Sequence, residues 1–248
     1  MRALRNPFVQ VLLWTLGIGS VFTAIVLTVP WLPEQSSTAA GPVDTLYEVL
    51  AVISSYIFGL VVSILLVSVI HFRRRHHDLS DGEPIHGNTR LEAIWTAIPA
   101  LLMVGAAVYS GLVLADIEET KANTQDVAIT GQQFAWTFDY TALGFKAGEL
   151  HLVKGTPYHF KLRAKDVIHS FWVPQFRMKK DAVPGLTTDI RVTPTRTGTY
   201  TLACTELCGL GHATMRAKVV VEDQAAFDKW AVQAKKAQNL IGGLESRQ

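Results

Sequence analysis

Residues 199–215 read TYTLACTELCGLGHATM, a β-rich run that leads into a loop crowded with metal-ligating side chains. The alternating Thr, Tyr, Thr and Leu at its start are typical of a strand. Four potential ligands then follow within twelve residues: Cys204, Cys208, His212 and Met215. The same spacing would align them on one face of a helix, but Gly209 and Gly211 each cost about 1 kcal/mol relative to Ala inside a helix. The stretch therefore predicts a strand that ends in a metal-binding loop.

The types of ligand in this loop favour copper. Thiolates and thioethers are soft ligands, and together with imidazole they suit copper better than hard cations. Two thiolates this close can bridge two metal ions, and His169, at a plausible strand end upstream, would supply a second imidazole. Zinc is disfavoured because Met is a poor zinc ligand. A disulfide between Cys204 and Cys208 remains an alternative in an oxidising compartment, although it leaves His212 and Met215 without a role.

Further β-rich runs surround this loop. They cover residues 127–130, 134–140, 158–162, 190–193, 200–203 and 217–221. Turn residues such as Gly131, Gly155 and Gly198 separate them, and short strands at this spacing predict a β-sandwich or small barrel. Downstream, residues 223–237 indicate a surface helix and residues 239–248 a polar tail.

Upstream, three apolar stretches stand out at residues 8–31, 49–71 and 93–115, and none contains a charged residue. Each has more than 20 residues, so a helix of that length reaches ~30 Å or more and can cross a bilayer. Pro99 falls in the first turns of the third stretch, where proline is best tolerated. The net charge of +2 over 248 residues gives no reason to expect nucleic acid as a partner.

Basic residues in the short loops predict the orientation of these spans. Arg2 and Arg5 precede the first stretch, and Arg73, Arg74, Arg75 and Arg90 lie between the second and third. The loop 32–46 has no Lys or Arg, so everything after residue 115 is predicted to lie outside the cell. The small residues 36–40 leave open a cleaved signal peptide, but the first stretch exceeds the usual signal core and favours a retained span.

With these residues in view, the chain resembles subunit II of the haem–copper cytochrome c oxidases. The family motif Cys-x-Glu-x-Cys-x-x-x-His-x-x-Met is matched in full from Cys204 to Met215. Other family-like blocks are LEAIWTAIP at 91–99, GQQFAW at 131–136, VIHSF at 167–171 and DAVPG at 181–185. The similarity runs from about residue 44 to residue 230.

The resemblance implies an all-β cupredoxin-like Greek-key barrel outside the membrane, anchored by a transmembrane helical hairpin, and the first apolar stretch adds an extra N-terminal helix to this fold. The implied domains are an N-terminal apolar segment with an external loop (1–43), the hairpin (44–116), the external domain (117–222), and a C-terminal helix and tail (223–248). Such a protein lies in the bacterial plasma membrane, with its C-terminal domain on the outer side.

The resemblance also implies a mixed-valence dinuclear copper centre, called CuA. The implied ligands are Cys204 and Cys208 as bridges, His169 and His212 on one copper each, and Met215 with the backbone carbonyl of Glu206. The Glu206 side chain would face a Mg²⁺ or Mn²⁺ ion shared with the catalytic subunit, because hard carboxylate oxygen suits such an ion.

By the same resemblance, the protein works as an enzyme only within a complex with the haem-bearing subunit I. It would accept electrons from cytochrome c, or from a tethered c-type cytochrome, and pass them to subunit I for oxygen reduction coupled to proton pumping. Glu92, at the cytoplasmic end of the last span, would be the entrance of a proton pathway. The alternative is an interfacial anchor paired with Arg90.

The electron-entry region departs from the family pattern. Phe134 stands where many relatives have the tryptophan that receives the electron, while Trp136 remains. A packed strand residue is the alternative for Phe134. From residue 116 onwards there are 17 Lys and Arg against 14 Asp and Glu. A local acidic patch could still be formed by Asp139, Asp166 and Asp181. Otherwise the donor is neutral, acidic or tethered.

Other classes of protein fit the motif less well. Quinol oxidase subunits II share the architecture but lack the thiolate pair, and a single-copper blue protein needs one cysteine. Nitrous oxide reductase is a much larger soluble protein without the hairpin. A membrane-anchored copper-binding or assembly protein would not need Glu206, Glu92 or the block 91–99.

Overall fold

The computed structural model describes residues 6–74, 77, 81–82 and 84–245, and it divides into two compact units. The helical unit comprises Met1–Leu32 and Asp44–Val113, and the β unit comprises Pro33–Val43 and Leu114–Gln248. Three arginines used to predict the orientation, Arg2, Arg5 and Arg75, lie outside the described residues.

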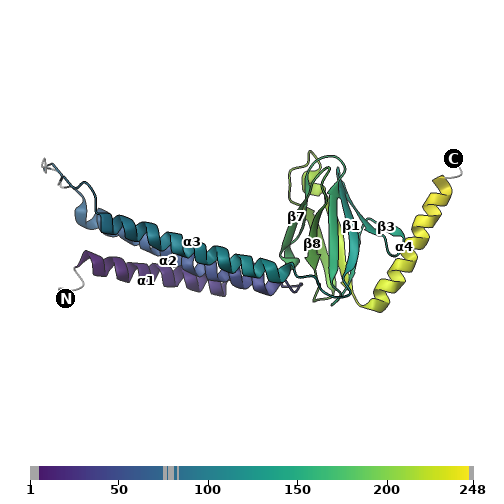
Figure 1. Ribbon diagram of the computed structural model, residues 1–248, viewed down its shortest axis with the longest axis horizontal. Coiled ribbons are helices and arrows are strands. Elements are labelled where there is room, and N and C mark those ends of the chain that lie inside the picture. The colour runs from purple at the N-terminus through teal and green to yellow at the C-terminus, as the bar shows by residue number, and fades with distance from the viewer. Residues whose placement is uncertain (1–5, 75–76, 78–80, 83, 246–248) are drawn as a thin grey trace. The chain divides into compact units, whose positions relative to one another are not determined.

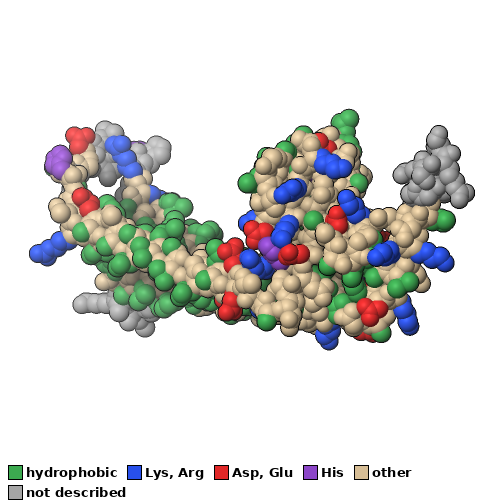
Figure 2. All heavy atoms as spheres, turned by 45° about the vertical axis from the view of Figure 1, so that its right-hand side comes forward, with side chains coloured by type: hydrophobic (Ala, Val, Ile, Leu, Met, Phe, Trp, Pro, Cys, Tyr) green, Lys and Arg blue, Asp and Glu red, His purple; other side chains and the backbone are tan. Residues whose placement is uncertain are grey.

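Three long helices make up most of the helical unit: α1 (Pro7–Thr28), α2 (Ala40–Phe72) and α3 (Thr89–Ile117). All three are long and apolar enough to cross a membrane, and hydrophobic side chains cover their surface in Figure 2. Helix α1 begins where Asn6 Oδ1 accepts the Phe8 N–H at 2.9 Å, with Pro7 in the first turn. The three predicted spans are therefore confirmed as helices.

Helices α1 and α2 pack through small residues. A Cβ added at Gly19 would overlap the Tyr56 ring, and one added at Gly59 would lie 3.0 Å from the Thr15 carbonyl oxygen. The rings of Phe22 and Phe58 meet edge to face at 5.0 Å. Close helix contact through glycine is typical of membrane helices, where packing replaces the hydrophobic effect.

The β unit consists of two five-stranded sheets, seen in part in Figure 1, with strand orders β3-β2-β1-β5-β8 and β4-β10-β9-β6-β7. The strands are β1 (Gln125–Gln132), β2 (Ala135–Tyr140), β3 (Phe145–Ala147), β4 (Leu150–Val153), β5 (Tyr158–Ala164), β6 (His169–Val173), β7 (Met178–Ala182), β8 (Thr188–Val192), β9 (Gly198–Cys204) and β10 (Arg216–Glu222). β1 pairs with β5 and β4 with β10 in parallel, and the other pairs are antiparallel. The predicted fold class, membrane helices followed by a cupredoxin-like β domain, is confirmed.

Four strands had not been predicted: β3, β4, β6 and β7. β3 and β4 have only three and four residues, too few for a visible alternation. β7 reads MKKDA, and its charged residues are tolerated because it lies at the edge of its sheet.

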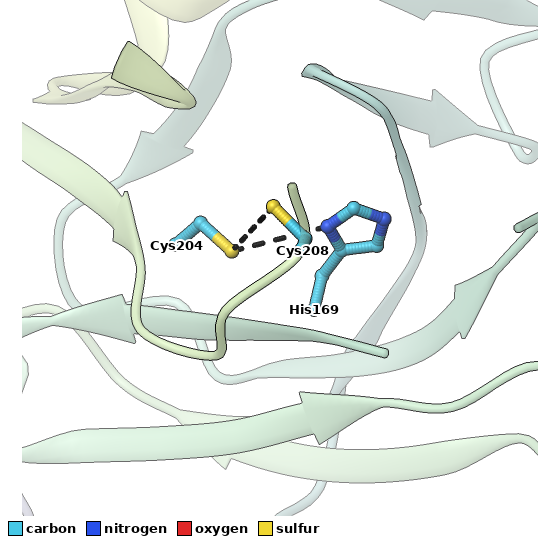
Figure 3. Close-up of side chains that lie close together, drawn as sticks. All are labelled: His169, Cys204 and Cys208. Atoms are coloured by element: carbon cyan, nitrogen blue, oxygen red, sulfur yellow. Dashed lines mark hydrogen bonds between the residues drawn. The ribbon is translucent and has the colours of Figure 1, made fainter. Parts of the chain in front are cut away.

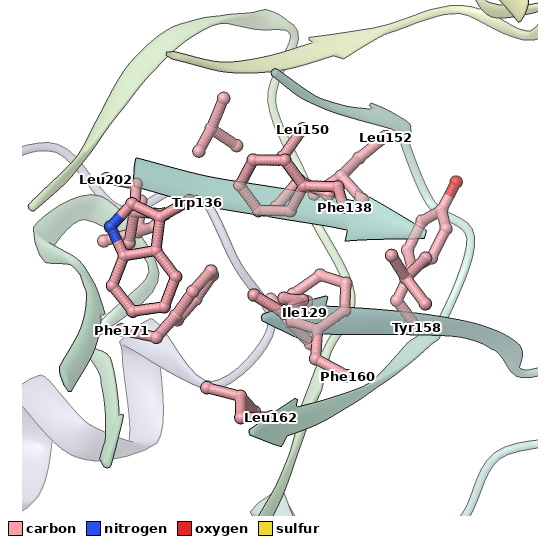
Figure 4. Packing of buried hydrophobic residues seen from close by; sticks show 14 of the residues in the cluster. Ile129, Trp136, Phe138, Leu150, Leu152, Tyr158, Phe160, Leu162, Phe171 and Leu202 are labelled. Carbon is pink, nitrogen blue, oxygen red and sulfur yellow. The ribbon is translucent and has the colours of Figure 1, made fainter. Parts of the chain in front are cut away.

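The core lies between the two sheets and is rich in aromatic side chains (Figure 4). Ile129, Phe138 and Phe160 from one sheet meet Phe171 and Leu202 from the other, and all are 0–1% exposed. Burying one such side chain stabilises a fold by about 1.5–3 kcal/mol. This core supports the strand ends that carry the metal-ligating residues.

The segment between α1 and α2 is built into the β unit. Residues 33–39, here called the strap, include Ser36 and Ser37, which are 0% and 5% exposed. The Ser36 N–H donates to the Gln175 carbonyl at 2.9 Å, and the Thr195 N–H donates to the Ser36 carbonyl at 2.9 Å. Ser37 Oγ donates to the Phe176 carbonyl at 2.8 Å. The strap, expected to be an external loop, is therefore an integral part of the β unit.

Helix α4 (Gln224–Glu245) packs against β3 and β4. Trp230 stacks on His151 with ring centroids 3.8 Å apart. Further along, Gln238 Oε1 accepts the Lys146 N–H at 2.5 Å. The prediction of a polar tail from residue 239 is wrong up to residue 245, because the helix continues to Glu245. Residues 246–248 lie outside the described residues.

Candidate metal centre

The ligand-rich loop connects two paired strands. β9 ends at Cys204 and β10 begins at Arg216, and Ala203 lies opposite Arg216 in their antiparallel register. The Cys204 N–H donates to the Met215 carbonyl at 3.0 Å, which closes the base of the loop. Only a short 3₁₀ helix, η3 (His212–Thr214), interrupts it. The loop is therefore not an α-helix, in agreement with the prediction made from its glycines.

The sulfur atoms of Cys204 and Cys208 converge with the His169 imidazole (Figure 3). Cys204 Sγ lies 3.8 Å from Cys208 Sγ and 3.9 Å from His169 Nδ1. Cys208 Sγ lies 3.6 Å from His212 Nδ1 and 3.8 Å from Met215 Sδ. The backbone oxygen of Glu206 lies 3.3 Å from Cys204 Sγ. Ligands bound to one metal at about 2.0–2.3 Å stand roughly 3.3–3.8 Å apart, so these separations fit a metal centre.

Each imidazole faces a different sulfur. His169 Nδ1 approaches Cys204, which ends β9, whereas His212 Nδ1 approaches Cys208 in the middle of the loop. Two metal ions bridged by two thiolates require one such imidazole on each side. The loop and β6 thus place one imidazole beside each of the two thiols.

Both cysteines are free and buried, with 6% and 3% exposure for Cys204 and Cys208. Their sulfur atoms, 3.8 Å apart, lie well beyond bonding distance for a disulfide. Burial, reinforced by the hydrogen bond with Cys204, raises the pKa of the Cys208 thiol to about 11. A pair of thiolates in this position therefore needs compensating positive charge, which a bound metal supplies.

His169 occupies a closely fitted slot. It is 0% exposed, and its Nε2 lies 2.8 Å from Asp166 Oδ1 while Nδ1 faces the sulfur. On another side, a Cβ added at Gly131 would lie 2.9 Å from His169 Cδ2. The Trp136 ring stands edge-on, with centroids 6.0 Å apart. Carboxylate, glycine and indole together fix the orientation of this imidazole.

Asp166 is itself held by the backbone. Although burial opposes ionisation, the Gln133 N–H at 2.7 Å, His169 and the Val167 N–H at 2.8 Å lower the pKa of Asp166 to about 2. The sequence reasoning treated Asp166 only as a surface charge. Its position three residues before His169 was the available signal, because ligand imidazoles commonly donate their second N–H to a carboxylate.

Phe134 lies in the turn between β1 and β2 rather than in a strand, and it is 40% exposed. Its ring covers two glycines of the ligand loop, since a Cβ at Gly209 or Gly211 would come within 3.2 Å or 2.5 Å of ring atoms. The neighbouring Gln133 Nε2 donates to the Cys208 carbonyl at 2.5 Å. By contrast, Trp136 is only 3% exposed and lies beside His169 in the core. Phe134 is thus the exposed aromatic residue against the ligand loop.

The two glutamates singled out from the sequence lie in different units. The Glu206 side chain is exposed on the ligand loop. Glu92 lies in the first turn of α3, where its Oε1 accepts the Asn88 N–H at 3.0 Å. Among the described residues it forms no ion pair with Arg90, so its carboxylate caps its own helix instead.

The three carboxylates considered as an acidic patch are each engaged elsewhere. Asp139 pairs with Lys146 at 3.4 Å. Asp181 accepts Ser170 Oγ at 2.7 Å and lies 3.4 Å from Lys179 Nζ. Asp166 is occupied by His169. These contacts oppose the idea that the three carboxylates together attract a basic partner.

Two family models match the chain. The transmembrane domain of cytochrome c oxidase subunit II matches residues 22–113, and the periplasmic domain of the same subunit matches residues 147–223. The chain is 34% identical to cytochrome c oxidase subunit 2 of Thermostichus vulcanus, over 88% of this chain and 84% of that relative. It is 32% identical to cytochrome c oxidase subunit 2 of a Synechocystis strain, over 87% and 80% respectively.

Among solved structures, the β unit is similar to the periplasmic domain of subunit II of cytochrome oxidase from Bradyrhizobium japonicum. The identity is 26%, the TM-score is 0.46, and the match covers 48% of this chain and 99% of that one.

Proposed function

The chain belongs to the subunit II family of the haem–copper cytochrome c oxidases, and from this we propose that it carries electrons from a c-type cytochrome to the catalytic subunit I. The family binds copper at a CuA site and is part of a membrane oxidase complex, with its C-terminal domain on the periplasmic side. One observation carries the proposal: two buried free thiols lie 3.8 Å apart, with an imidazole facing each sulfur.

The proposed centre holds two copper ions. Its ligands are Cys204 and Cys208 as bridges, His169 and His212 as terminal imidazoles, and Met215 with the Glu206 carbonyl as weaker ligands. When bound, the copper pair supplies a one-electron carrier. The chain's own contribution is a rigid frame, because a ligand slot that does not move between oxidation states keeps the reorganisation small.

Delivery by a c-type cytochrome, rather than by a quinol, is supported by the intact ligand set. A quinol-oxidising subunit needs no copper, so it would have no use for two buried thiols beside two imidazoles. The exposed ring of Phe134, which covers Gly209 and Gly211, offers an aromatic contact above the ligand loop for an incoming donor. A membrane-anchored copper-binding or assembly protein is the second candidate, and it would use the same ligands.

Two carboxylates are proposed to serve the catalytic subunit. The exposed Glu206 side chain is proposed to bind a Mg²⁺ or Mn²⁺ ion shared with subunit I, while its backbone carbonyl, 3.3 Å from Cys204 Sγ, would serve the copper. Glu92 is proposed as a proton entrance at the cytoplasmic end of α3. Its carboxylate is exposed and accepts only the Asn88 N–H among the described residues, which is compatible with proton uptake.

Helix α1 is proposed to stay in the mature protein as a third span. The small residues that suggested signal cleavage fall in the strap, where Ser36 and Ser37 are buried and hydrogen-bonded within the β unit. Cutting there would remove backbone bonds to Gln175 and Thr195. N-terminal sequencing of the assembled complex tests this proposal, and a mature terminus between residues 36 and 41 would contradict it.

The decisive test of function compares Cys208→Ser with the wild type in the purified oxidase complex. In the wild type we expect two coppers in subunit II, an EPR spectrum with one unpaired electron shared between them, and electron uptake from a c-type cytochrome. In Cys208→Ser we expect that signal to vanish and the donation rate to fall at least about 100-fold, because one bridge is lost. Ala213→Ser, an exposed change in the same loop, is the control.

The outcomes separate the candidate functions. Unchanged electron uptake in a correctly assembled Cys208→Ser complex would falsify the proposal. A chain that binds two coppers but is absent from the active oxidase would favour the assembly protein.

A further inference from the structure

We propose that the electron donor of this subunit is an acidic protein that docks on a basic rim around Phe134. The rim consists of Arg163, Lys165 and Arg216. This inference rests on the proposed function, because it names the class of protein that supplies electrons to the copper centre.

Two members of the basic rim lie where β5 ends beside the metal centre. Arg163 lies opposite Thr130 in the parallel pair of β5 and β1. The Lys165 N–H donates to the Gly131 carbonyl at 3.1 Å, and Gly131 is the glycine packed against His169. Both side chains are exposed. They therefore border the turn that carries Phe134, only a few residues from the imidazole slot.

The third member lies on the other side of that turn. Arg216 is the first residue of β10 and directly follows Met215, and its side chain is exposed. Arg216 therefore stands at the end of the ligand loop whose two glycines the Phe134 ring covers.

The charges of the rim are not neutralised within the described residues. No ion pair there involves Arg163, Lys165 or Arg216, and Arg163 Nε donates only to the neutral Thr187 Oγ1 at 2.6 Å. The carboxylate next to the rim, Asp166, is occupied by His169 and two backbone N–H groups. The other nearby acid, Glu206, is proposed to bind the ion shared with subunit I. Hydrogen bonds from neutral groups do not cancel the charge of a carboxylate, but the three cations of the rim outnumber these two carboxylates by one.

Two exposed apolar side chains, Phe134 and Leu210, lie at the centre of the basic rim. Phe134 is 40% exposed and Leu210 is 106% exposed, and Leu210 sits between the two glycines that the Phe134 ring covers. An apolar centre bordered by charge is the arrangement that orients a transient partner, with charge steering the encounter and apolar contact bringing the redox centres close. The complementary partner has an apolar contact around its redox group and a border of Asp and Glu.

The experiment measures electron donation to the purified oxidase complex from two c-type cytochromes, one acidic and one basic, with matched reduction potentials. The second-order rate constant is recorded from about 10 mM to about 500 mM salt, a range over which screening removes surface attraction. The variants are Lys165→Glu and the double change Arg163→Glu with Lys165→Glu. The control is Lys229→Glu, an exposed cation on α4, the helix that packs on β3 and β4.

We expect the acidic donor to be faster at low salt and its advantage to disappear at high salt. The double variant should slow the acidic donor roughly tenfold or more at low salt and speed the basic one. Lys229→Glu should leave both rates within about twofold. The copper EPR signal is recorded for every variant, and the salt dependence of the wild type tests the inference even if a variant fails to assemble.

The results that overturn the inference differ from those that overturn the proposed function. A basic donor that is faster at low salt, or wild-type rates that do not depend on salt, would end the inference while leaving the copper centre intact. If neither cytochrome reduces the complex but a quinol does, the proposed function itself fails, and this inference fails with it.

Discussion

The two imidazoles of the metal centre are held in contrasting ways. His169 belongs to β6, which pairs with both β7 and β9, and its ring is fixed by Asp166 and Gly131. His212 begins a three-residue 3₁₀ helix in a loop and is only half-buried. Within the described residues no hydrogen bond reaches its second ring nitrogen. The imidazole of His169 is thus fixed by side-chain contacts of the β domain, whereas that of His212 has fewer such contacts.

The two imidazoles show how one domain can hold one metal ligand rigidly and carry the other on a loop. A slot fixed by the core keeps the first ligand in place whether or not metal is bound. A ligand on a loop would let a metal enter, and the metal-ligand bonds would then add to the stability of the loop.

Removing the copper should give the largest difference between the two halves. We expect chelation to speed backbone amide exchange in residues 209–214 by at least about tenfold, because the loop loses the metal bonds of His212 and Cys208. Exchange in residues 169–173 should change little, since β6 keeps its partners on both sides. Hydrogen-exchange mass spectrometry of the complex measures both segments together. An equal loss of protection in both segments would show that the two imidazoles are held in the same way.

Asp166→Asn should weaken copper binding by about 10–100-fold, because a neutral amide holds the His169 imidazole less firmly than a carboxylate does. Competition with a chelator measures the change in affinity, and the EPR spectrum reports any change at the ligand. Asp139→Asn, which removes a surface partner of Lys146 away from the site, is the matched control. An unchanged affinity would mean that packing alone positions His169.

Gly131→Ala should destabilise the β domain by about 1–3 kcal/mol, since the new methyl group meets the His169 ring at 2.9 Å in a closely packed slot. Gly148→Ala is the control, because nothing lies within 4 Å of the added Cβ there. Thermal unfolding of the complex compares the two variants. Equal midpoints would show that the His169 slot can expand without cost.

Phe134→Leu should have the smallest effect on stability, below about 1 kcal/mol, because the ring is 40% exposed and covers only glycines of the loop. Copper content should stay the same, while electron donation slows a few-fold through the loss of aromatic contact. A large drop in copper retention would instead show that Phe134 holds the His212 half together, and would reduce the contrast between the two imidazoles.

Several features follow from local sequence alone. The three spans were predictable because an uncharged run of more than 20 residues has few stable states other than a membrane helix. The loop from Cys204 to Met215 was predictable because its four ligands lie within twelve residues and its glycines exclude a helix. Local chemistry thus determined the anchor, the β-rich class of the external domain and the soft ligand set.

Other features exist only because distant segments meet. Asp166 clamps His169 because the Gln133 N–H, 33 residues away, holds the carboxylate in place. The strap joins the β domain because Ser36 bonds to Gln175. Helix α4 is joined to β3 because Gln238 reaches Lys146 across 92 residues. The physical reason is common to all three: a local pattern sets which face is buried, but the partner of a polar group is decided only when the strands take their register.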